Sequence, residues 1–394
     1  MADPWVTIIG LGEDGPAGLS DASRAALAGA DVIFGGPRHL ALVAAADRGR
    51  EWPVPFSVGP VLECRGQRVV VLASGDPFWH GAGAQLVPHL TDTEWQSHPA
   101  PSTFQLAANR LGWAIERVDC LGLHAAPFAR AMPRLHPGAR LIATLRDGAA
   151  AAEFARWLVA KGWTDSRLWV MESLGGPQER IRQTLAQTYG LTDVAAPVII
   201  AFEPAGAKGL PCTSGRPDAG FAHDGQITKS AIRALTLSAL APRPGEVLWD
   251  LGAGSGSVSV EWCLAGGRAI AVEVRPDRTE NILNNARKFG VDHRLDLVTG
   301  RWADELATLP AVPDAVFIGG GADAAGLERV WHVLPGGCRM VINSVTLETD
   351  ALLARWQADH GGTLLRIDLA HATPLGKSRG WSAQRTVTQW SVSR

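Results

Sequence analysis

Features of secreted and membrane proteins are missing from this 394-residue sequence. No apolar stretch approaches the roughly 18 residues that a membrane span requires. The start lacks a basic segment followed by an apolar run, which a secretory signal would need. The five cysteines are odd in number, far apart and without a CxxC pair, so we expect reduced, mostly buried thiols. Together these absences predict a cytoplasmic protein without a membrane partner.

Neither sign of charge dominates the composition. There are 37 Lys and Arg residues against 39 Asp and Glu, and the resulting net charge of −2 argues against a large nucleic-acid footprint. Lysine is scarce, because only five of the basic residues are lysine. Codon bias, which the high Ala and Gly content also indicates, is the favoured explanation. The alternative is carboxylate recognition, because the planar fork of arginine suits bidentate contacts with carboxylates. The eleven histidines show no metal-ligand spacing, so no metal site is expected.

The length predicts two or three domains, and the composition indicates where one domain ends and the next begins. The stretch from Pro204 to Ala222 is rich in Gly, Pro and small polar residues and has no helical or strand period. We therefore expect a first domain over 1–205, a linker over 206–222 and a second domain over 223–394. A second break, at Pro99 to Ser102, divides the first domain into lobes of about 1–100 and 101–205.

Short apolar runs alternate with helical patterns on both sides of the expected linker, which predicts α/β layers with mostly parallel sheets. Strands are expected at 6–9, 69–72, 140–144, 168–171, 247–249, 269–272, 315–318 and 340–342. Helices are expected at 20–28, 150–160, 229–240, 258–264 and 277–289. The end differs, because 364–369 and 385–390 alternate like a hairpin with no helix between them.

A glycine loop in the second half carries the strongest chemical signal. A strand ends at Asp250, glycines follow at 252, 254 and 256, and a helical pattern begins near Ser257. Glycines let a ligand approach the backbone, and the helix N-terminus favours an anion. Glu273 ends the next strand, where a ribose diol would be held. Both a dinucleotide and S-adenosylmethionine fit this geometry.

The first half opens with a literal GxGxxG, Gly10 to Gly15, after a strand. A nicotinamide site would need a carboxylate at the end of the next strand. The nearest candidate, Asp31, stands before that strand, and Pro16 occupies the place where a helix should meet pyrophosphate. The residues therefore do not favour an oxidoreductase.

Resemblance to two families accounts for both loops. In the second half, GxGxG after Asp250, the segment from Asp314 to Gly321 and the terminal hairpin resemble the class I S-adenosylmethionine methyltransferases. In the first half, VTIIGLGEDGP, the ASGDPFW of 73–79 and the PSTFQLAA of 101–108 resemble the tetrapyrrole methylases, although Pro101 departs from their pattern. Across nearly the whole chain, the order of these modules resembles the fused, decarboxylating precorrin methyltransferases of corrin-ring (vitamin B12) synthesis.

The resemblance implies an α/β architecture in which a bilobal tetrapyrrole-methylase-like domain precedes a Rossmann-like class I methyltransferase domain with a seven-stranded sheet. It also implies two S-adenosylmethionine sites, one in each half. The expected donor-binding residues in the first half are Gly10, Gly12, Ser74, Gly75, Asp76, Pro77, Phe78, Ser102 and Thr103. In the second half they are Asp250, Gly252, Ala253, Gly254, Gly256, Ser257, Glu273, Trp302 and Ala303.

The activity that the resemblance implies is methylation of precorrin-6B at C-5 by the first half and at C-15 by the second. The second half would also remove carbon dioxide from the ring C acetate, giving precorrin-8. The alternative is a methyltransferase that acts on RNA or on a protein side chain. We further expect a homo-oligomer that uses neither metal nor nucleic acid.

Substrate and catalytic residues are less well marked. Expected substrate contacts are Thr228, Lys229, Arg233, Gly320, Lys377 and Arg379. Lys229 and Arg233 lie one helical turn apart, an arrangement that suits either substrate carboxylates or a solvated helix face. Catalytic residues remain unassigned, with Glu261, Asn343 and Ser344 as candidates.

Overall fold

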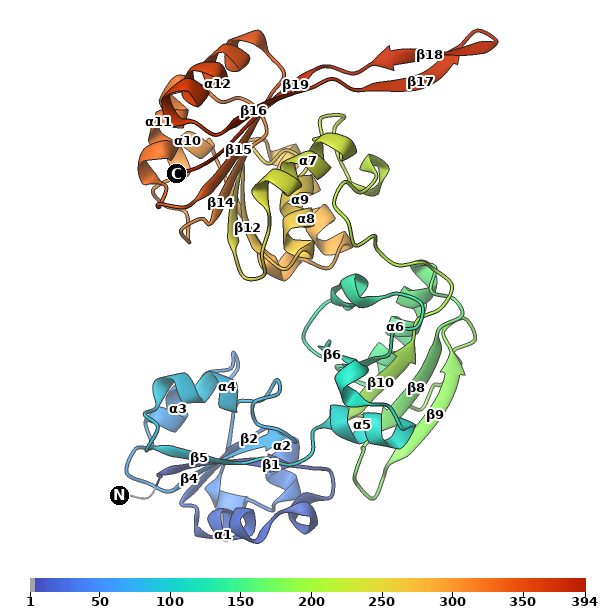
Figure 1. Ribbon diagram of the computed structural model, residues 1–394. Coiled ribbons are helices and arrows are strands. Elements are labelled where there is room, and N and C mark those ends of the chain that lie inside the picture. Colours follow the sequence, from blue (N-terminus) through green and yellow to red (C-terminus); the bar gives the residue numbers. More distant parts are fainter. Residues whose placement is uncertain (1–3) are drawn as a thin grey trace. The chain divides into compact units, whose positions relative to one another are not determined.

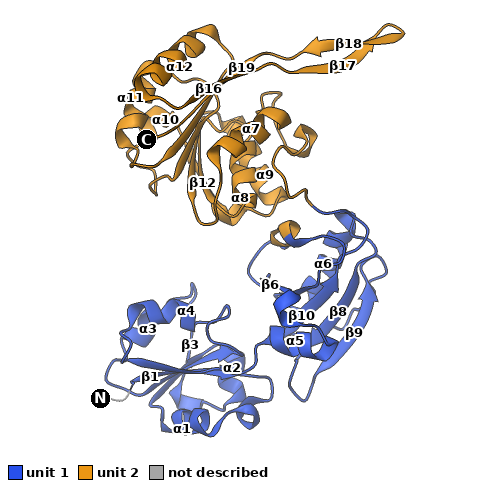
Figure 2. Cartoon of the chain, viewed as in Figure 1, with its two compact units in different colours: residues 1–128, 134–209 blue, residues 129–133, 210–394 orange. Residues whose placement is uncertain are grey.

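The computed structural model describes residues 4–394 as two compact units, which are coloured separately in Figure 2. Unit 1 ends at Gly209 and omits 129–133, and unit 2 takes those five residues together with Leu210–Arg394. None of the helices within residues 4–394 is long and apolar enough to cross a membrane.

The first lobe of unit 1 is a parallel five-stranded sheet in the order β3-β2-β4-β1-β5 (Figure 1). Its strands are β1(Val6–Leu11), β2(Val32–Gly35), β3(Gly49–Glu51), β4(Val69–Ser74) and β5(Trp95–His98). The residues of β1 are buried throughout, which is why this central strand reads as a continuous apolar run. The helices of this lobe are α1(Asp21–Gly29), α2(Pro37–Leu42), α3(Gly59–Leu62) and α4(Gly83–Leu86).

The second lobe holds a mixed sheet, in contrast to the mostly parallel sheets that the sequence predicted. Its order is β6-β7-β10-β8-β9, and only the β6–β7 pair is parallel. The reason lies in the connections, because no α-helix separates β8, β9 and β10 to carry the chain back across the sheet. The elements are α5(Thr103–Leu111), β6(Asp119–Gly122), β7(Leu141–Thr144), α6(Gly148–Ala160), β8(Arg167–Glu172), β9(Arg180–Leu185) and β10(Val198–Glu203).

Unit 2 contains the expected seven-stranded sheet, in the order β13-β12-β11-β14-β15-β19-β16. The first five strands of this order are parallel, and β19 pairs antiparallel with both β15 and β16. Its strands are β11(Val247–Leu251), β12(Arg268–Glu273), β13(Leu295–Thr299), β14(Ala315–Ile318), β15(Arg339–Ser344), β16(Thr363–Ile367) and β19(Val387–Ser393). Its helices are α7(Ser230–Leu240), α8(Ser257–Leu264), α9(Pro276–Lys288), α10(Trp302–Glu305), α11(Ala324–Val333) and α12(Leu347–His360).

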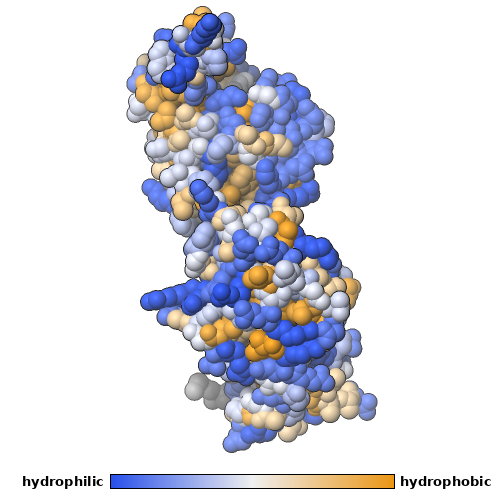
Figure 3. All heavy atoms as spheres, turned by 90° about the vertical axis from the view of Figure 1, so that its right-hand side faces the viewer, coloured by the Kyte–Doolittle hydropathy of each residue, from blue (hydrophilic) through white to orange (hydrophobic). Residues whose placement is uncertain are grey.

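A two-stranded hairpin, which the sequence did not predict, is inserted between β16 and β19. Its strands, β17(Ala370–Leu375) and β18(Ser378–Ala383), pair only with each other and project from unit 2 in Figure 1. Leu375 and Trp381 are 69% and 80% exposed. At the top of Figure 3, the hairpin presents hydrophilic and hydrophobic residues side by side.

The stretch expected as a linker is anchored at several points, although more than half of its residues are exposed. A side chain at Gly206 would collide with the backbone of Gly162 in unit 1. Arg216 and Phe221 are buried in unit 2, and the backbone amides of Gly215 and Arg216 both donate to Glu261. Residues 210–222 therefore form part of unit 2, because a buried carboxylate holds a segment that has no period of its own.

Candidate functional site

Unit 1 contains a cavity of about 580 Å³ between its two lobes. The expected residues Gly12, Ser74, Gly75, Ser102 and Thr103 line it, at the carboxyl ends of β1 and β4 and the start of α5. Gly10, Asp76, Pro77 and Phe78, which were also expected there, are not among its lining residues. The strand ends of an open α/β sheet are where ligands bind in such folds.

The glycines beside this cavity bring backbone segments together. A Cβ at Gly10 would lie 1.9 Å from the Gly75 carbonyl oxygen. Gly75 has φ +59°, and a Cβ there would lie 2.6 Å from the Cα of Ser102. Ser102 in turn caps α5, since its hydroxyl accepts from the Gln105 amide and the Gln105 side chain accepts from the Ser102 amide. These residues build the cavity floor, and Gly10 does so without facing the cavity.

A polar group made of Glu13, Arg38, His39 and Ser74 lies on the cavity wall. Arg38 contacts the Glu13 carboxylate, and its Nη2 lies 2.9 Å from both His39 Nε2 and Ser74 Oγ. His39 Nε2 is also 2.9 Å from Ser74 Oγ. Burial, together with the charge of Arg38, lowers the pKa of His39 to about 4. At neutral pH this imidazole is therefore an uncharged base.

Aromatic and further basic side chains complete the lining of the cavity. Trp52 and Phe56 lie on one side with their rings 4.9 Å apart, and Trp79 stacks on Phe104 at 5.0 Å. His124 Nδ1 lies 3.0 Å from the Thr144 hydroxyl, and burial lowers the pKa of this histidine. His80 and Arg146 also line the cavity. Flat apolar surfaces and cationic groups thus face the same space.

Unit 2 contains a smaller pocket of about 190 Å³ at the carboxyl ends of β11, β12 and β13. It brings together four expected donor-binding residues: Gly252, Glu273, Trp302 and Ala303. Gly321 lines it as well, next to the predicted substrate contact Gly320. Asp250, Ala253, Gly254, Gly256 and Ser257 belong to the adjoining strand and loop but are not among its lining residues.

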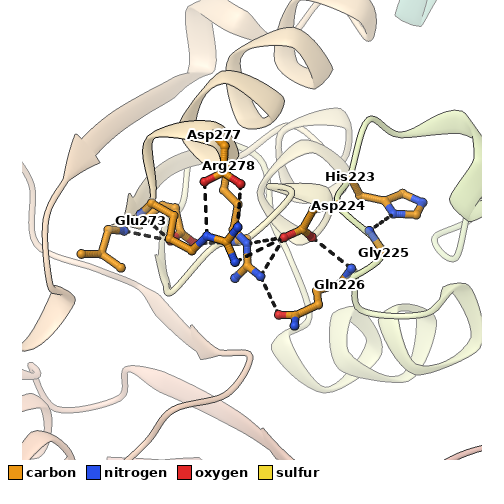
Figure 4. Close-up of polar contacts among 10 residues, drawn as sticks. His223, Asp224, Gly225, Gln226, Glu273, Asp277 and Arg278 are labelled. Carbon is orange, nitrogen blue, oxygen red and sulfur yellow. Dashed lines mark hydrogen bonds and ion pairs between the residues drawn. The ribbon is translucent and has the colours of Figure 1, made fainter.

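The glycine loop and Glu273 are joined directly. Gly252, Gly254 and Gly256 all have positive φ, a conformation that L residues rarely adopt. Glu273 Oε2 accepts from the Gly254 amide at 2.8 Å, and Oε1 accepts from the amides of Val274 and Arg275 (Figure 4). Each carboxylate oxygen has two lone pairs, so Glu273 keeps acceptor capacity while it shapes the loop.

Asp250 holds the helix after the loop. Its Oδ2 accepts from the backbone and the hydroxyl of Ser259, whereas Oδ1 is buried without a partner. Burial raises the pKa of Asp250 to about 6. The expected donor contact is therefore an internal residue that positions α8.

Two arginines that follow Glu273 in the sequence, Arg275 and Arg278, contact the segment before α7 at the edge of the pocket. The sequence analysis did not predict this contact. Asp224 lies 2.9 Å from Arg278 and 3.5 Å from Arg275, and Arg278 also donates to the Gln226 side chain (Figure 4). About fifty residues separate the partners, so no local pattern signals this contact.

The predicted role of Arg233 as a substrate contact is wrong. Its side chain has no exposure, and it pairs with Glu261 at 2.8 Å and with Asp218 at 3.3 Å. It also donates to the Thr228 carbonyl. The helix face expected to be open is covered by residues 215–221. Lys229 stays half-exposed, 3.9 Å from Asp218.

The candidate catalytic residues are also engaged in the interior. Glu261 accepts from Arg233 and from two backbone amides, so it anchors 215–216 rather than reaching the pocket. Asn343 is buried and bonds to Thr236 and Gln389, which joins α7, β15 and β19. Ser344 is buried and contacts the backbone of Thr346. Burial and complete pairing argue against a chemical role for these three.

Three further predicted substrate contacts lie on the surface. Gly320 is exposed after β14, beside the pocket. Lys377 and Arg379 are exposed on the projecting hairpin. Within residues 4–394, no group of three or more His, Cys, Asp or Glu side chains is placed to hold a metal ion.

Two family models match this chain. The model described as tetrapyrrole (corrin/porphyrin) methylases covers residues 6–189, and the model described as a precorrin methyltransferase domain covers 219–394. The chain is 46% identical to a Sinorhizobium protein named precorrin-6Y C(5,15)-methyltransferase [decarboxylating], over 100% of this chain and 97% of that protein.

Two shorter proteins match part of the chain. A solved C-terminal domain of precorrin-6Y C5,15-methyltransferase from Rhodobacter capsulatus is 58% identical, with a TM-score of 0.46, over 47% of this chain and 100% of that one. A Saccharolobus solfataricus protein named probable cobalt-precorrin-6B C(15)-methyltransferase (decarboxylating) is 37% identical, over 34% of this chain and 71% of its own length.

Proposed function

The chain belongs to the family of precorrin-6Y C(5,15)-methyltransferases (decarboxylating) of cobalamin biosynthesis, and from this premise we propose that each of its units binds one S-adenosylmethionine. The donor supplies an electrophilic methyl group. The observation that carries the proposal is that two separate pockets open at the strand ends of two different sheets.

The residues of the unit 2 pocket fit the donor. Glu273 offers carboxylate lone pairs at a strand tip, where a ribose diol is held in folds of this kind. Trp302 supplies a flat surface for adenine, and the open space at Gly254, where a Cβ would meet nothing within 4 Å, leaves room for a ligand. In unit 1 the donor would lie along Gly12, Ser74, Gly75 and Thr103.

We assign C-5 methylation to unit 1, and C-15 methylation with loss of the ring C acetate carboxyl to unit 2, so that precorrin-6B becomes precorrin-8. A shorter relative carries C(15) methylation and decarboxylation together in its name, which supports placing both steps in one unit. A meso carbon of a reduced tetrapyrrole is enamine-like, and the macrocycle accepts the electrons released with carbon dioxide. The protein then mainly aligns donor and acceptor, a contribution of up to about 7–11 kcal/mol.

The lining of unit 1 suits a flat polycarboxylate. Arg38 and Arg146 present guanidinium groups, and Trp52 and Phe56 present aromatic faces. In unit 2, Lys229 and Arg301 offer cations in place of the buried Arg233. No feature of the site favours RNA or a protein side chain as the acceptor. The cytoplasmic location stays a prediction.

The projecting hairpin supports the expected homo-oligomer. A two-stranded hairpin alone is marginally stable in water, and β17–β18 exposes Trp381 and Leu375. We propose that a second copy of this chain covers the hairpin.

A single variant of the full chain tests the division between the units. Gly254→Val places a β-branched residue at φ +59° and fills the open space, so it should stop donor binding in unit 2 only. Supplied with precorrin-6B, this variant should yield a product with one added methyl and every carboxyl group retained. Mass spectrometry that finds a decarboxylated product would contradict the assignment.

A further inference from the structure

The triangle of Arg38, His39 and Ser74 settles which nitrogen of His39 carries a hydrogen. A guanidinium only donates hydrogen bonds, so His39 Nε2, which is 2.9 Å from Arg38 Nη2, must act as an acceptor. The ring is therefore the neutral form with its hydrogen on Nδ1. The Ser74 hydroxyl lies 2.9 Å from the same Nε2 and can donate its hydrogen to this nitrogen, so that Arg38 and Ser74 share its one lone pair.

The Ser74 hydroxyl also faces the cavity. Ser74 ends β4, is exposed, and lines the cavity beside Gly75 and Gly12. His39 lines the same wall from α2. A molecule in the cavity thus meets a hydroxyl that is backed by an uncharged imidazole, an arrangement that accepts a proton from the cavity side and passes it inward.

Methylation of a meso carbon requires such an acceptor. The new carbon–carbon bond forms with electrons from the enamine-like macrocycle, and the carbon–sulfur bond breaks with its pair left on sulfur. The macrocycle then carries one positive charge and one proton more than the neutral methylated product. That proton has to leave, and a base within the cavity speeds its departure.

We propose that Ser74 and His39 form the proton acceptor of unit 1, with the Ser74 hydroxyl taking the proton from the methylated macrocycle while giving its own to His39 Nε2. The proposal rests on the assignment of C-5 methylation to this unit. The proton ends on His39 Nε2, which then no longer accepts from Arg38 Nη2, and Arg38 keeps its hydrogen bond to Ser74 Oγ. The imidazolium releases the proton to solvent, and no other co-reactant is needed.

The charges around His39 favour its unprotonated form, which is the form that can accept a proton. Arg38, on the same helix, disfavours a second positive charge, and Glu13, from the loop after β1, pairs with Arg38. From β4 the facing group is the Ser74 hydroxyl, and from β2 it is Gly35, which carries no charge. With a pKa near 4, His39 stays unprotonated throughout the neutral range. His124 and His80 line the cavity as well, but within residues 4–394 no hydrogen bond joins either of them to Ser74.

The test uses the full chain with His39→Gln and, separately, Ser74→Ala. Each variant is supplied with precorrin-6B and S-adenosylmethionine, and mass spectrometry identifies the products. We expect His39→Gln to slow C-5 methylation by about 100-fold. Its remaining rate should rise with pH from about pH 6 to about pH 9, because hydroxide replaces the lost base, while the wild-type rate stays flat. Ser74→Ala should slow the same step at saturating S-adenosylmethionine, where a contribution of Ser74 to donor binding no longer affects the rate. Calorimetric titration of His39→Gln with S-adenosylmethionine should still give two equivalents, which shows that unit 1 is folded. C-15 methylation by the same samples should be unchanged, which shows the same for unit 2.

Two controls separate the possible failures. His136→Gln removes an exposed histidine of unit 1 that does not line the cavity, and it should leave the rate and the pH profile of C-5 methylation unchanged. Nitrogen NMR of labelled histidine in the full chain should show His39 as the Nδ1–H form, independently of activity. A flat profile and full C-5 rate in His39→Gln would overturn the proposal. If C-5 methylation were instead lost in Gly254→Val, the assignment of units would fail rather than the proton acceptor.

Discussion

Arg233 Nε lies 2.8 Å from the Glu261 carboxylate in the interior of unit 2, and neither side chain is exposed to solvent. The same carboxylate accepts from the amides of Gly215 and Arg216, and Arg233 also reaches Asp218. This pair therefore fastens the segment entering unit 2 to α7 and α8. Removing one partner leaves a buried charge without compensation.

Glu261→Gln should accordingly destabilise unit 2 by about 3–5 kcal/mol. The amide keeps the shape, but the Arg233 guanidinium then pairs only with Asp218, and the buried Arg216, 3.5 Å from Glu261, loses its counter-charge. Urea unfolding of the full chain would show an earlier transition for this unit, whereas donor affinity under native conditions should be retained. Glu280→Gln on the exposed face of α9 is the matched control and should change stability by less than about 0.5 kcal/mol. Lost catalysis at unaltered stability would restore Glu261 as a catalytic candidate.

Calorimetric titration of the full chain with S-adenosylmethionine should give two equivalents. In Glu273→Ala, one site should weaken by about 1–3 kcal/mol, because a ribose hydroxyl loses its acceptor and the Gly254 amide loses its partner. Glu273→Gln, which keeps one acceptor oxygen, should weaken that site less. A single equivalent in the wild type, or two unchanged sites in Glu273→Ala, would contradict the donor assignment.

The buried Asp250 should make unit 2 sensitive to pH. Its folded pKa, about 6, lies above the ordinary value of 3.8, so the folded state holds the proton more tightly than the unfolded chain. The stability that this group contributes is present below about pH 4 and is lost as the pH rises through about 6. Asp250→Asn removes that loss, so its stability relative to wild type should grow by up to about 3 kcal/mol between pH 4 and pH 7.

Asp277→Asn provides the opposite case for this measurement. The side chain of Arg275 lowers the pKa of Asp277, so any change in relative stability should appear at lower pH and with the other sign. Denaturant unfolding at a series of pH values checks both variants. If the difference in unfolding free energy between Asp250→Asn and wild type does not vary with pH, the pKa of Asp250 is not raised in the folded state.

The hairpin should govern oligomeric state. Replacing Leu375 and Trp381 together by serine removes the apolar surface that a second copy would cover, so light scattering should report a smaller mass than for the wild type. Replacing Lys377 and Arg379 by alanine alters the same hairpin without removing apolar area and should leave the mass unchanged. An unaltered mass in the serine variant would place the contact elsewhere or exclude it.

The elements that the sequence predicted are those with a strong local period. The apolar runs of β1 and β4 must be buried on both faces, so they indicate central parallel strands before any contact is known. The strand, glycine loop and helix around Gly254 and the carboxylate at the tip of β12 follow from the spacing alone. For the same reason Glu273 and Trp302 meet in one pocket, since the ends of parallel strands share one edge of a sheet.

The tertiary structure decided which polar residues remain available. Arg233 lies one helical turn from Lys229, and the local sequence pattern is the same whether this helix face meets water or is covered by residues 215–221. The partners of Asn343 and Asp224 lie tens of residues away in the sequence. The sequence by itself determined the two-domain α/β architecture, the family and the donor loop, because period and spacing are local. Only the folded chain assigned Arg233, Glu261 and Asn343 to the interior and placed His39 against Ser74, because burial and pairing depend on segments that the sequence holds far apart.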